Sequence, residues 1–177
     1  MEYLQTKIPD VWLITSSPYE DERGTFLKAF SEDFLIAPIN FNLTEVNVSS
    51  TRMMGSIRGM HMQNSPYAEK KIVRCLYGSI FDVAIDMRPN SPTYLRYVSQ
   101  ELSALNYSAL VIPEGFAHGF QTLENNSIVH YITSQKHSQE HERGIRYNDP
   151  AIDIDWPMEV TQVSKKDREW PLLSAED

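Results

Sequence analysis

Cysteine, glycine and basic residues are all scarce in this sequence, and each shortage excludes a class of protein. The single cysteine, Cys75, excludes an internal disulfide framework. Lysine and arginine number 16 against 24 acidic residues, which gives a net charge of −8. Duplex nucleic acid is bound mostly through Lys and Arg at its phosphates, so an acidic chain without a basic run disfavours that partner. The 7 glycines and 10 prolines are scattered and mark neither a linker nor a repeat.

Long apolar runs are missing as well. No stretch approaches the roughly 18 apolar residues that a membrane span needs, so no membrane partner is expected. The first ten residues, MEYLQTKIPD, have neither the basic start nor the apolar segment of a secretory signal. We therefore expect a cytoplasmic protein. A length of 177 residues with 41% hydrophobic content suits one domain, residues 1–177, with a single core.

The middle of the chain consists of short β-rich runs separated by turns. Lys71–Asp86 contains two runs split at Tyr77–Gly78, and its second half alternates apolar and polar residues as a half-buried strand does. Further runs are Tyr94–Leu102, Ser108–Pro113 and Ser127–Ser134. Their spacing predicts an antiparallel sandwich or barrel. Helix signals are limited to Ser31–Ile36, behind a serine cap, and to Ser164–Glu169.

Two segments place a histidine near glycine, where the backbone can lie close to a ligand. They are Arg58–Gln63 (RGMHMQ), with Lys71 ten residues after His61, and Pro113–Phe120 (PEGFAHGF), which contains His118. Histidine is the side chain best suited to exchange a proton near neutral pH. An isolated histidine is more often structural, and the other three, His130, His137 and His141, are interpreted as solvated.

A metal site is the first alternative for these histidines. Pro113-x-Gly115-x-x-His118 is similar to half of a cupin metal signature, and neutral imidazole is a good ligand for first-row metals. The other half needs two histidines one residue apart, but the second place here is Gln63. A site made of His61, Glu69 and His118 stays open, although it is short of a ligand.

A series of ordered motifs covers the chain from about Asp21 to Leu173. The motifs are Asp21–Phe26, Arg58–His61, Lys71–Cys75, Phe81–Arg88 with Ser91–Thr93, Pro113–Phe120, Glu142–Ile145 with Asn148–Pro150, Ile154–Pro157, and Ser164–Asp167 with Pro171–Leu173. In this order they resemble the dTDP-4-dehydrorhamnose 3,5-epimerase family. The resemblance is very specific for the superfamily and less specific for the exact substrate.

The resemblance implies a fold and an assembly. The expected fold is all-β, a cupin-like double-stranded β-helix (jelly roll). A few short peripheral helices are expected around it. Members use no metal and no cofactor. They are usually homodimers in which an N-terminal strand is exchanged and the partner contributes to the pocket.

The resemblance also implies a reaction, epimerisation at C3, C5 or both of a nucleotide-linked 4-keto-6-deoxyhexose. The C4 ketone acidifies the hydrogens on C3 and C5, so the enzyme needs a base, an acid on the opposite face, and a group that stabilises the enolate. By family match, His61 is the base, Asp167 its partner and Tyr131 the acid. Lys71 then lies near the C4 oxygen.

The family match extends to the nucleotide. Arg23 and Arg58 match phosphate contacts, and His118, Glu142, Lys166 and Asn47 match other binding positions. The complete predicted substrate-binding set is Arg23, Phe26, Lys28, Glu45, Asn47, Arg58, Gln63, His118, His137, Glu142 and Lys166.

Three positions in the nucleotide half depart from the family pattern. Lys28 replaces a glutamate, Glu45 a glutamine, and His137 the tyrosine that stacks on thymine. An ammonium cannot accept the N3–H of thymine, whereas cytosine offers an acceptor at N3 and a donor at N4. One hypothesis is therefore a CDP-linked substrate. The alternative is a Lys28–Glu45 salt bridge with no effect on the choice of base.

The carbon that is inverted stays open too. Met62 replaces an aromatic after the base, and one extra residue lies between Asn47 and His61. Either change would alter how the sugar rotates, so an enzyme specific for C3 or for C5 is an alternative. Two other classes remain, a metal-dependent cupin isomerase or oxygenase and a catalytically silent binding module. The presence of all four catalytic residue types argues against the silent module.

Overall fold

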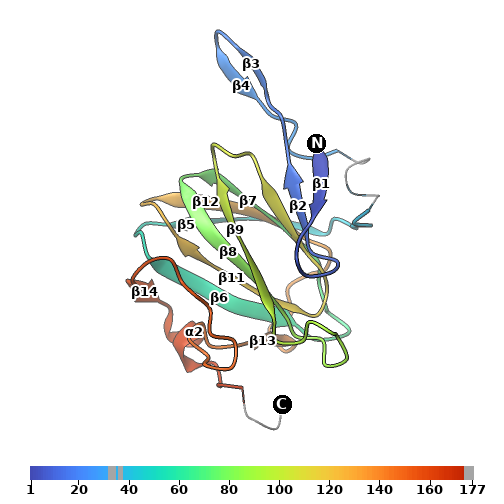
Figure 1. Cartoon of the computed structure of the whole chain (residues 1–177), viewed down its shortest axis with the longest axis vertical. Coiled ribbons are helices and arrows are strands. Elements are labelled where there is room, and N and C mark those ends of the chain that lie inside the picture. The colour runs from blue at the N-terminus through green and yellow to red at the C-terminus, as the bar shows by residue number, and fades with distance from the viewer. Residues whose placement is uncertain (32–34, 36–37, 174–177) are drawn as a thin grey trace.

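The computed structural model describes residues 1–31, 35 and 38–173, and its strands form two large sheets (Figure 1). The first sheet runs in the order β1 (Glu2–Gln5), β2 (Trp12–Thr15), β10 (Ala109–Ile112), β7 (Lys71–Tyr77), β12 (Ser127–Thr133) and β5 (Glu45–Thr51). Every pairing in it is antiparallel.

The second sheet runs in the order β13 (Glu142–Gly144), β6 (Ser56–Gln63), β11 (Phe116–Thr122), β8 (Ser79–Asp86) and β9 (Tyr97–Ser103). A short sixth strand, β14 (Gln162–Val163), pairs with β6 in parallel. Apart from β1–β2 and β8–β9, the neighbours in both sheets are not consecutive along the chain, as in a jelly roll rather than a meander. The all-β, cupin-like fold predicted from the sequence is confirmed.

The main core lies between the two sheets. Its buried members alternate along the strands, as side chains on one face of a strand must. They include Val73 and Cys75 of β7, Leu110 and Ile112 of β10, Ile80 and Ala84 of β8, and Phe116 and Phe120 of β11. Burial of this apolar area holds the sheets face to face, which leaves one end of the interior for a polar cavity.

A two-stranded hairpin stands apart from both sheets. It consists of β3 (Tyr19–Asp21) and β4 (Gly24–Phe26), and Figure 1 shows it projecting beyond the body of the molecule. Its Phe26 side chain is 70% exposed.

The strand and helix predictions hold with small differences. The runs in 71–86 form β7 and β8, and the runs at 108–113 and 127–134 form β10 and β12. Strand β9 begins at Tyr97 rather than Tyr94, because Leu95 has a φ of 61° and the preceding residues form turns. Most of the predicted helix Ser31–Ile36 lies outside the described residues.

The predicted C-terminal helix is α2 (Lys165–Glu169). Ser164 caps it, since its Oγ accepts the Asp167 N–H at 3.0 Å. None of the helices in the described ranges is long and apolar enough to cross a membrane.

Candidate active site

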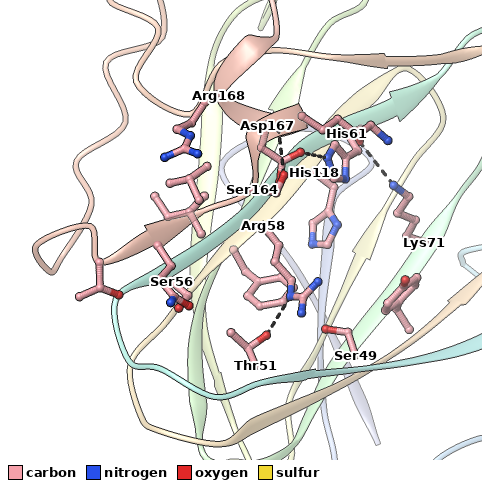
Figure 2. A pocket seen from close by; sticks show the side chains of 17 residues that line it. Ser49, Thr51, Ser56, Arg58, His61, Lys71, His118, Ser164, Asp167 and Arg168 are labelled. Carbon is pink, nitrogen blue, oxygen red and sulfur yellow. Dashed lines mark hydrogen bonds and ion pairs between the residues drawn. The ribbon is translucent and has the colours of Figure 1, made fainter.

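A cavity of about 610 Å³ opens at one end of the space between the sheets (Figure 2). Strands β5, β7 and β12 line it from the first sheet, β6 and β11 from the second, and residues 161–168 close one side. Polar and charged side chains dominate its lining, and they include Ser49, Thr51, Arg58, His61, Lys71, His118, Tyr131, Lys166, Asp167 and Arg168. The cavity therefore brings together all four predicted catalytic residues.

His61 and Asp167 form a hydrogen-bonded pair at the top of the cavity in Figure 2. His61 comes from β6 and Asp167 from α2, and His61 Nε2 lies 2.6 Å from Asp167 Oδ1. Asp167 also accepts the Gly59 backbone N–H at 3.3 Å. Burial by itself raises the pKa of Asp167, but the hydrogen bonds from His61 and Gly59 outweigh it and leave the pKa below its usual value. An ionised Asp167 fixes a hydrogen on Nε2 of His61 and leaves Nδ1 as the basic nitrogen.

Packing beneath α2 holds Asp167 in this position. Trp170, which ends the helix, lies flat over Gly144 of β13, where an added Cβ would overlap the indole ring. Arg146 Nε donates to the Trp170 carbonyl oxygen at 3.0 Å. The indole also meets the His61 ring edge to face, with centroids 6.3 Å apart. The absent side chain at Gly144 thus leaves room for Trp170 against β13, next to the strand that carries His61.

The glycines beside the two histidines serve the strands rather than a ligand. A Cβ at Gly59 would lie 2.5 Å from the Gly119 Cα, and Gly59 has a φ of 121°. Strands β6 and β11 therefore approach closely where they carry His61 and His118, which are direct partners in the ladder. The sequence predicted that a ligand approaches the backbone at these glycines. In the structure, the group that approaches is the neighbouring strand.

Lys71 is held at the inner wall of the cavity by two contacts. Its Nζ lies 3.1 Å from Glu69 Oε1 and 3.4 Å from the His61 carbonyl oxygen. Only 10% of each of the Lys71 and Glu69 side chains is exposed. An ammonium in so dry a site interacts strongly with negative charge that develops beside it.

Tyr131 faces the cavity from β12, on the sheet opposite His61. Burial raises the pKa of the phenol, the charge of Arg58 lowers it, and the carboxylates of Glu69 and Glu45 raise it further. The net direction is upward from an ordinary value near 10. Tyr131 therefore keeps its proton at neutral pH and is able to donate it.

Cations suited to a diphosphate lie on two sides of the cavity. Arg58 Nε donates to Thr51 Oγ1 at 2.8 Å and its Nη2 to the Ser50 carbonyl at 3.1 Å, which holds the guanidinium at the centre of Figure 2. Lys166 Nζ lies 2.6 Å from the Glu142 carboxylate. His137, 63% exposed, approaches the same carboxylate at 3.3 Å. Burial raises the pKa of Glu142, but the bond from Lys166 outweighs it and lowers the pKa overall.

Some predicted binding residues lie away from this cavity. Glu45 and Asn47 are half-buried on β5 but do not line it. Gln63 is buried, and its amide is engaged by backbone groups of Tyr67, Lys136 and Ser138.

Arg23 and Phe26 lie on the projecting hairpin, and Lys28 follows it and is exposed. The Arg23 side chain is 83% exposed and pairs with Asp21. Among the described residues Lys28 makes no ion pair with Glu45. The Lys28–Glu45 salt bridge that was the alternative to a CDP-linked substrate is therefore absent within one chain.

Three residues behave otherwise than the sequence suggested. His141 is half-buried rather than solvated, and its Nδ1 lies 2.8 Å from Ser138 Oγ. His130 is half-buried rather than solvated, packs on the Phe30 ring at a centroid distance of 5.6 Å, and has a pKa lowered by burial. Asp82 of β8 was not identified as a site residue, yet its side chain is fully buried and its Oδ1 lies 2.8 Å from His118 Nε2. The alternation in β8 was seen, but both faces of the strand are buried, so its polar residues point into the protein.

No cluster of three or more metal-binding side chains occurs in the part of the chain that the structure describes. The three candidate ligands have other partners. His61 pairs with Asp167, His118 with Asp82, and Glu69 with Lys71.

Comparison with known proteins gives consistent matches over nearly the whole chain. The family model described as dTDP-4-dehydrorhamnose 3,5-epimerase matches residues 5–175. A protein of that name from Sinorhizobium fredii is 41% identical over 175 residues, which cover 98% of this chain and 90% of the relative. Another, from Shigella flexneri, is 39% identical over 168 residues, 94% of this chain and 93% of the relative.

A crystal structure from Legionella pneumophila is similar throughout. It is a dTDP-6-deoxy-D-glucose-3,5-epimerase in complex with dTDP-4-keto-L-rhamnose. The TM-score is 0.93 and the identity 35%, with 99% of this chain and 94% of that chain covered.

Proposed function

This chain belongs to the dTDP-4-dehydrorhamnose 3,5-epimerase family, and we propose that it inverts C3 and C5 of a dTDP-linked 4-keto-6-deoxyhexose through an enolate, with His61 as base and Tyr131 as acid. The observation that carries the mechanism is the placement of these two groups. They line one cavity from facing sheets, His61 from β6 and Tyr131 from β12. A base and an acid on opposite sides of a sugar ring are what inversion at carbon requires.

The first step is removal of a proton next to the ketone. Nδ1 of His61 takes the proton from C3 or C5, and the electron pair of the C–H bond moves onto the C4 oxygen. Asp167 stabilises the imidazolium that forms, because its carboxylate lies 2.6 Å from Nε2. Lys71 places an ammonium near the same oxygen. A single donor of this kind contributes roughly 10²–10³ in rate.

The second step returns a proton to the other face of the same carbon. Tyr131 supplies it, and the electron pair returns from the oxygen to form the new C–H bond. The raised pKa of Tyr131 keeps the phenol protonated until the enolate is present. His61 and Tyr131 then recover their starting states by exchange with water, which reaches a His61 side chain that is 32% exposed.

The substrate's diphosphate is bound by the cations on either side of the cavity, Arg58 and Lys166. Both are already oriented by neighbouring oxygens, Arg58 by Thr51 and Lys166 by Glu142. Pre-ordered cations bind a phosphate with less loss of side-chain entropy. Analysis by NMR of the product formed from dTDP-4-keto-6-deoxyglucose tests the whole proposal, since inversion at both carbons is expected.

We include in this proposal a homodimer, formed in the cytoplasm, in which the hairpin of one subunit completes the cavity of the other. In a single chain the hairpin contacts solvent, although three of its predicted binding residues, Arg23, Phe26 and Lys28, lie on or beside it. The edge strand β5 also exposes Val46 and Val48, at 55% and 64%. An uncovered apolar edge beside the cavity is a suitable place for a strand of a second copy.

Mixing two inactive variants tests this assembly. Arg23→Ala and His61→Ala are each expected to have little activity alone. In a heterodimer, one cavity combines the intact His61 of one subunit with the intact Arg23 of the other, so dissociating and re-associating an equal mixture should restore about a quarter of the sites. The measurement is epimerase activity before and after mixing, with Arg143→Ala in place of Arg23→Ala as the control for a surface arginine. Activity that stays at the level of the two separate variants would contradict a shared site.

A further inference from the structure

Asp82 is a buried carboxylate that contacts a residue of the cavity lining but has no part in the mechanism above. Asp82 of β8 is 0% exposed, and its Oδ1 meets His118 Nε2 at 2.8 Å. Its other oxygen, Oδ2, is buried and has no hydrogen-bond partner among the described residues. An ionised carboxylate in such a place is costly unless a positive group accompanies it. Burial raises the pKa of Asp82, while the charges of His118 and Lys71 oppose that rise.

The partner of Asp82 stands beside the catalytic base. His118 of β11 and His61 of β6 are direct partners in the antiparallel ladder, so their Cα atoms lie about 5 Å apart. The His118 side chain is 10% exposed and lines the cavity. Both histidines use Nε2 to contact a carboxylate, His61 with Asp167 and His118 with Asp82. The active site therefore contains two His–Asp pairs on adjacent strands.

The surroundings of His118 are the other ionisable groups of the cavity. Asp82 faces it from β8, His61 and Arg58 from β6, Lys71 from β7 and Tyr131 from β12. Asp82 is the group in direct contact with the ring. The charge state of this carboxylate consequently has the largest effect on the ring of His118.

The number of protons shared by Asp82 and His118 determines which nitrogen of the His118 ring carries a hydrogen. A buried carboxylate with one empty oxygen favours a pair that is neutral overall, which places one proton between Oδ1 and Nε2. Whichever of these two atoms holds that proton, the ring carries a second hydrogen on Nδ1. We propose that Asp82 is a positioning residue that keeps a hydrogen on Nδ1 of His118, so that this N–H donates a hydrogen bond to the C4 oxygen beside Lys71 as the enolate forms.

This inference rests on the proposed function and extends it. The base must reach a carbon bonded to C4, so a donor on the adjacent strand lies beside the C4 oxygen. No proton leaves the pair. The hydrogen bond strengthens as the C–H electron pair moves onto oxygen, so it favours the transition state over bound substrate.

Asp82→Ala tests the assignment. An asparagine would not, because its amide N–H can donate to Nε2 and so keep the hydrogen on Nδ1 of His118. Alanine offers Nε2 no hydrogen-bond partner, so the neutral imidazole no longer favours a hydrogen on Nδ1. We expect kcat to fall by about 10²-fold at pH 8, with the Kd for dTDP changed by less than about threefold. As the pH is lowered through about 6.5, an ordinary imidazole gains the missing hydrogen, so the ratio of variant to wild-type kcat should rise.

Asp86→Ala is the matched control. Asp86 lies on the same strand, is also 0% exposed, and pairs with Arg88, Ser91 and Thr93 away from the cavity. Its loss should lower stability without changing the pH dependence of kcat. A ratio for Asp82→Ala that stays flat with pH, or a kcat within about twofold of wild type, would overturn the proposal. A change in the Kd for dTDP in place of kcat would make the pair a phosphate contact and overturn it as well.

A second measurement determines the protonation of His118 in the unmodified protein. Ring ¹⁵N NMR, with His118 identified by comparison with His118→Gln, should report a protonated Nδ1 at pH 7.5. A bare Nδ1 would contradict the inference. Solvent exchange at C3 and C5 that still depends on His61 would show that the proposed function survives such a failure.

Discussion

Replacement of His61 by alanine should abolish turnover, with a loss of about 10³-fold or more. No other described group in the cavity is both basic and placed opposite Tyr131. Lys71 is engaged by Glu69, and His118 by Asp82. The alanine variant therefore loses proton removal itself, so exchange with solvent and inversion should disappear together. Initial rates of epimerisation and of deuterium uptake measure the effect.

Binding separates this chemical loss from unfolding. The cations expected to hold the diphosphate, Arg58 and Lys166, have partners that do not include His61, so the Kd for dTDP should stay within about threefold of wild type. His141→Ala is the control, because that histidine hydrogen-bonds Ser138 outside the cavity. Substantial residual activity in His61→Ala would mean that another group is the base.

The second large effect is expected at Tyr131→Phe, and it should separate two rates that usually change together. The variant retains His61, so the substrate still loses its proton and still exchanges with solvent from the His61 side. It has no donor on the other face, so inversion should fall by about 10²–10³-fold. Deuterium uptake measured by NMR on the same samples should fall much less.

Tyr67→Phe is the matched control for removing a phenol hydroxyl. Tyr67 stacks on His141 at a centroid distance of 4.5 Å and does not line the cavity. Its variant should retain both rates. Equal losses of exchange and inversion in Tyr131→Phe would show that Tyr131 is not a separate acid, and that its hydroxyl acts earlier, on the enolate.

The strands and the C-terminal helix could be predicted because their signals are local. Alternation marks β8, turn residues separate β7 from it, and Ser164 caps α2. The catalytic set was reachable only through the motifs, since nothing in SKKDRE indicates that Asp167 is buried against a histidine. Their meeting depends on Trp170 packing over Gly144, a contact between distant parts of the chain.

Asp82 and the hairpin mark the limits of sequence reasoning for two physical reasons. Alternation assigns polar residues to one face of a strand, but it does not say whether that face meets water or a cavity. Asp82 was therefore not distinguished from a solvated aspartate, although it is 0% exposed. The hairpin residues matched binding positions, yet in one chain they lie away from the cavity, and the second copy that we propose for their role is described by no local pattern.

The nucleobase that the enzyme prefers could not be predicted from the sequence for the same reason. Lys28 and His137, two of the positions that depart from the family pattern, are exposed in the single chain. In the homodimer that we propose, any contact with the base is completed across the subunit boundary. The CDP hypothesis stays a prediction, and comparable affinities for dTDP and CDP ligands would contradict it.

Proton exchange in D₂O tests the central claim most directly. The protein is incubated in parallel with dTDP- and CDP-4-keto-6-deoxyglucose, and C3 and C5 are followed by NMR. The account predicts deuterium at both carbons of the dTDP sugar, with uptake that requires His61. Uptake at one carbon, or only with the CDP sugar, would support proton removal through an enolate but would contradict the proposed substrate or the inversion of both carbons. Lys28, Glu45 and His137 would then be the positions to substitute. No uptake by either sugar, in protein that still binds dTDP, would contradict the account.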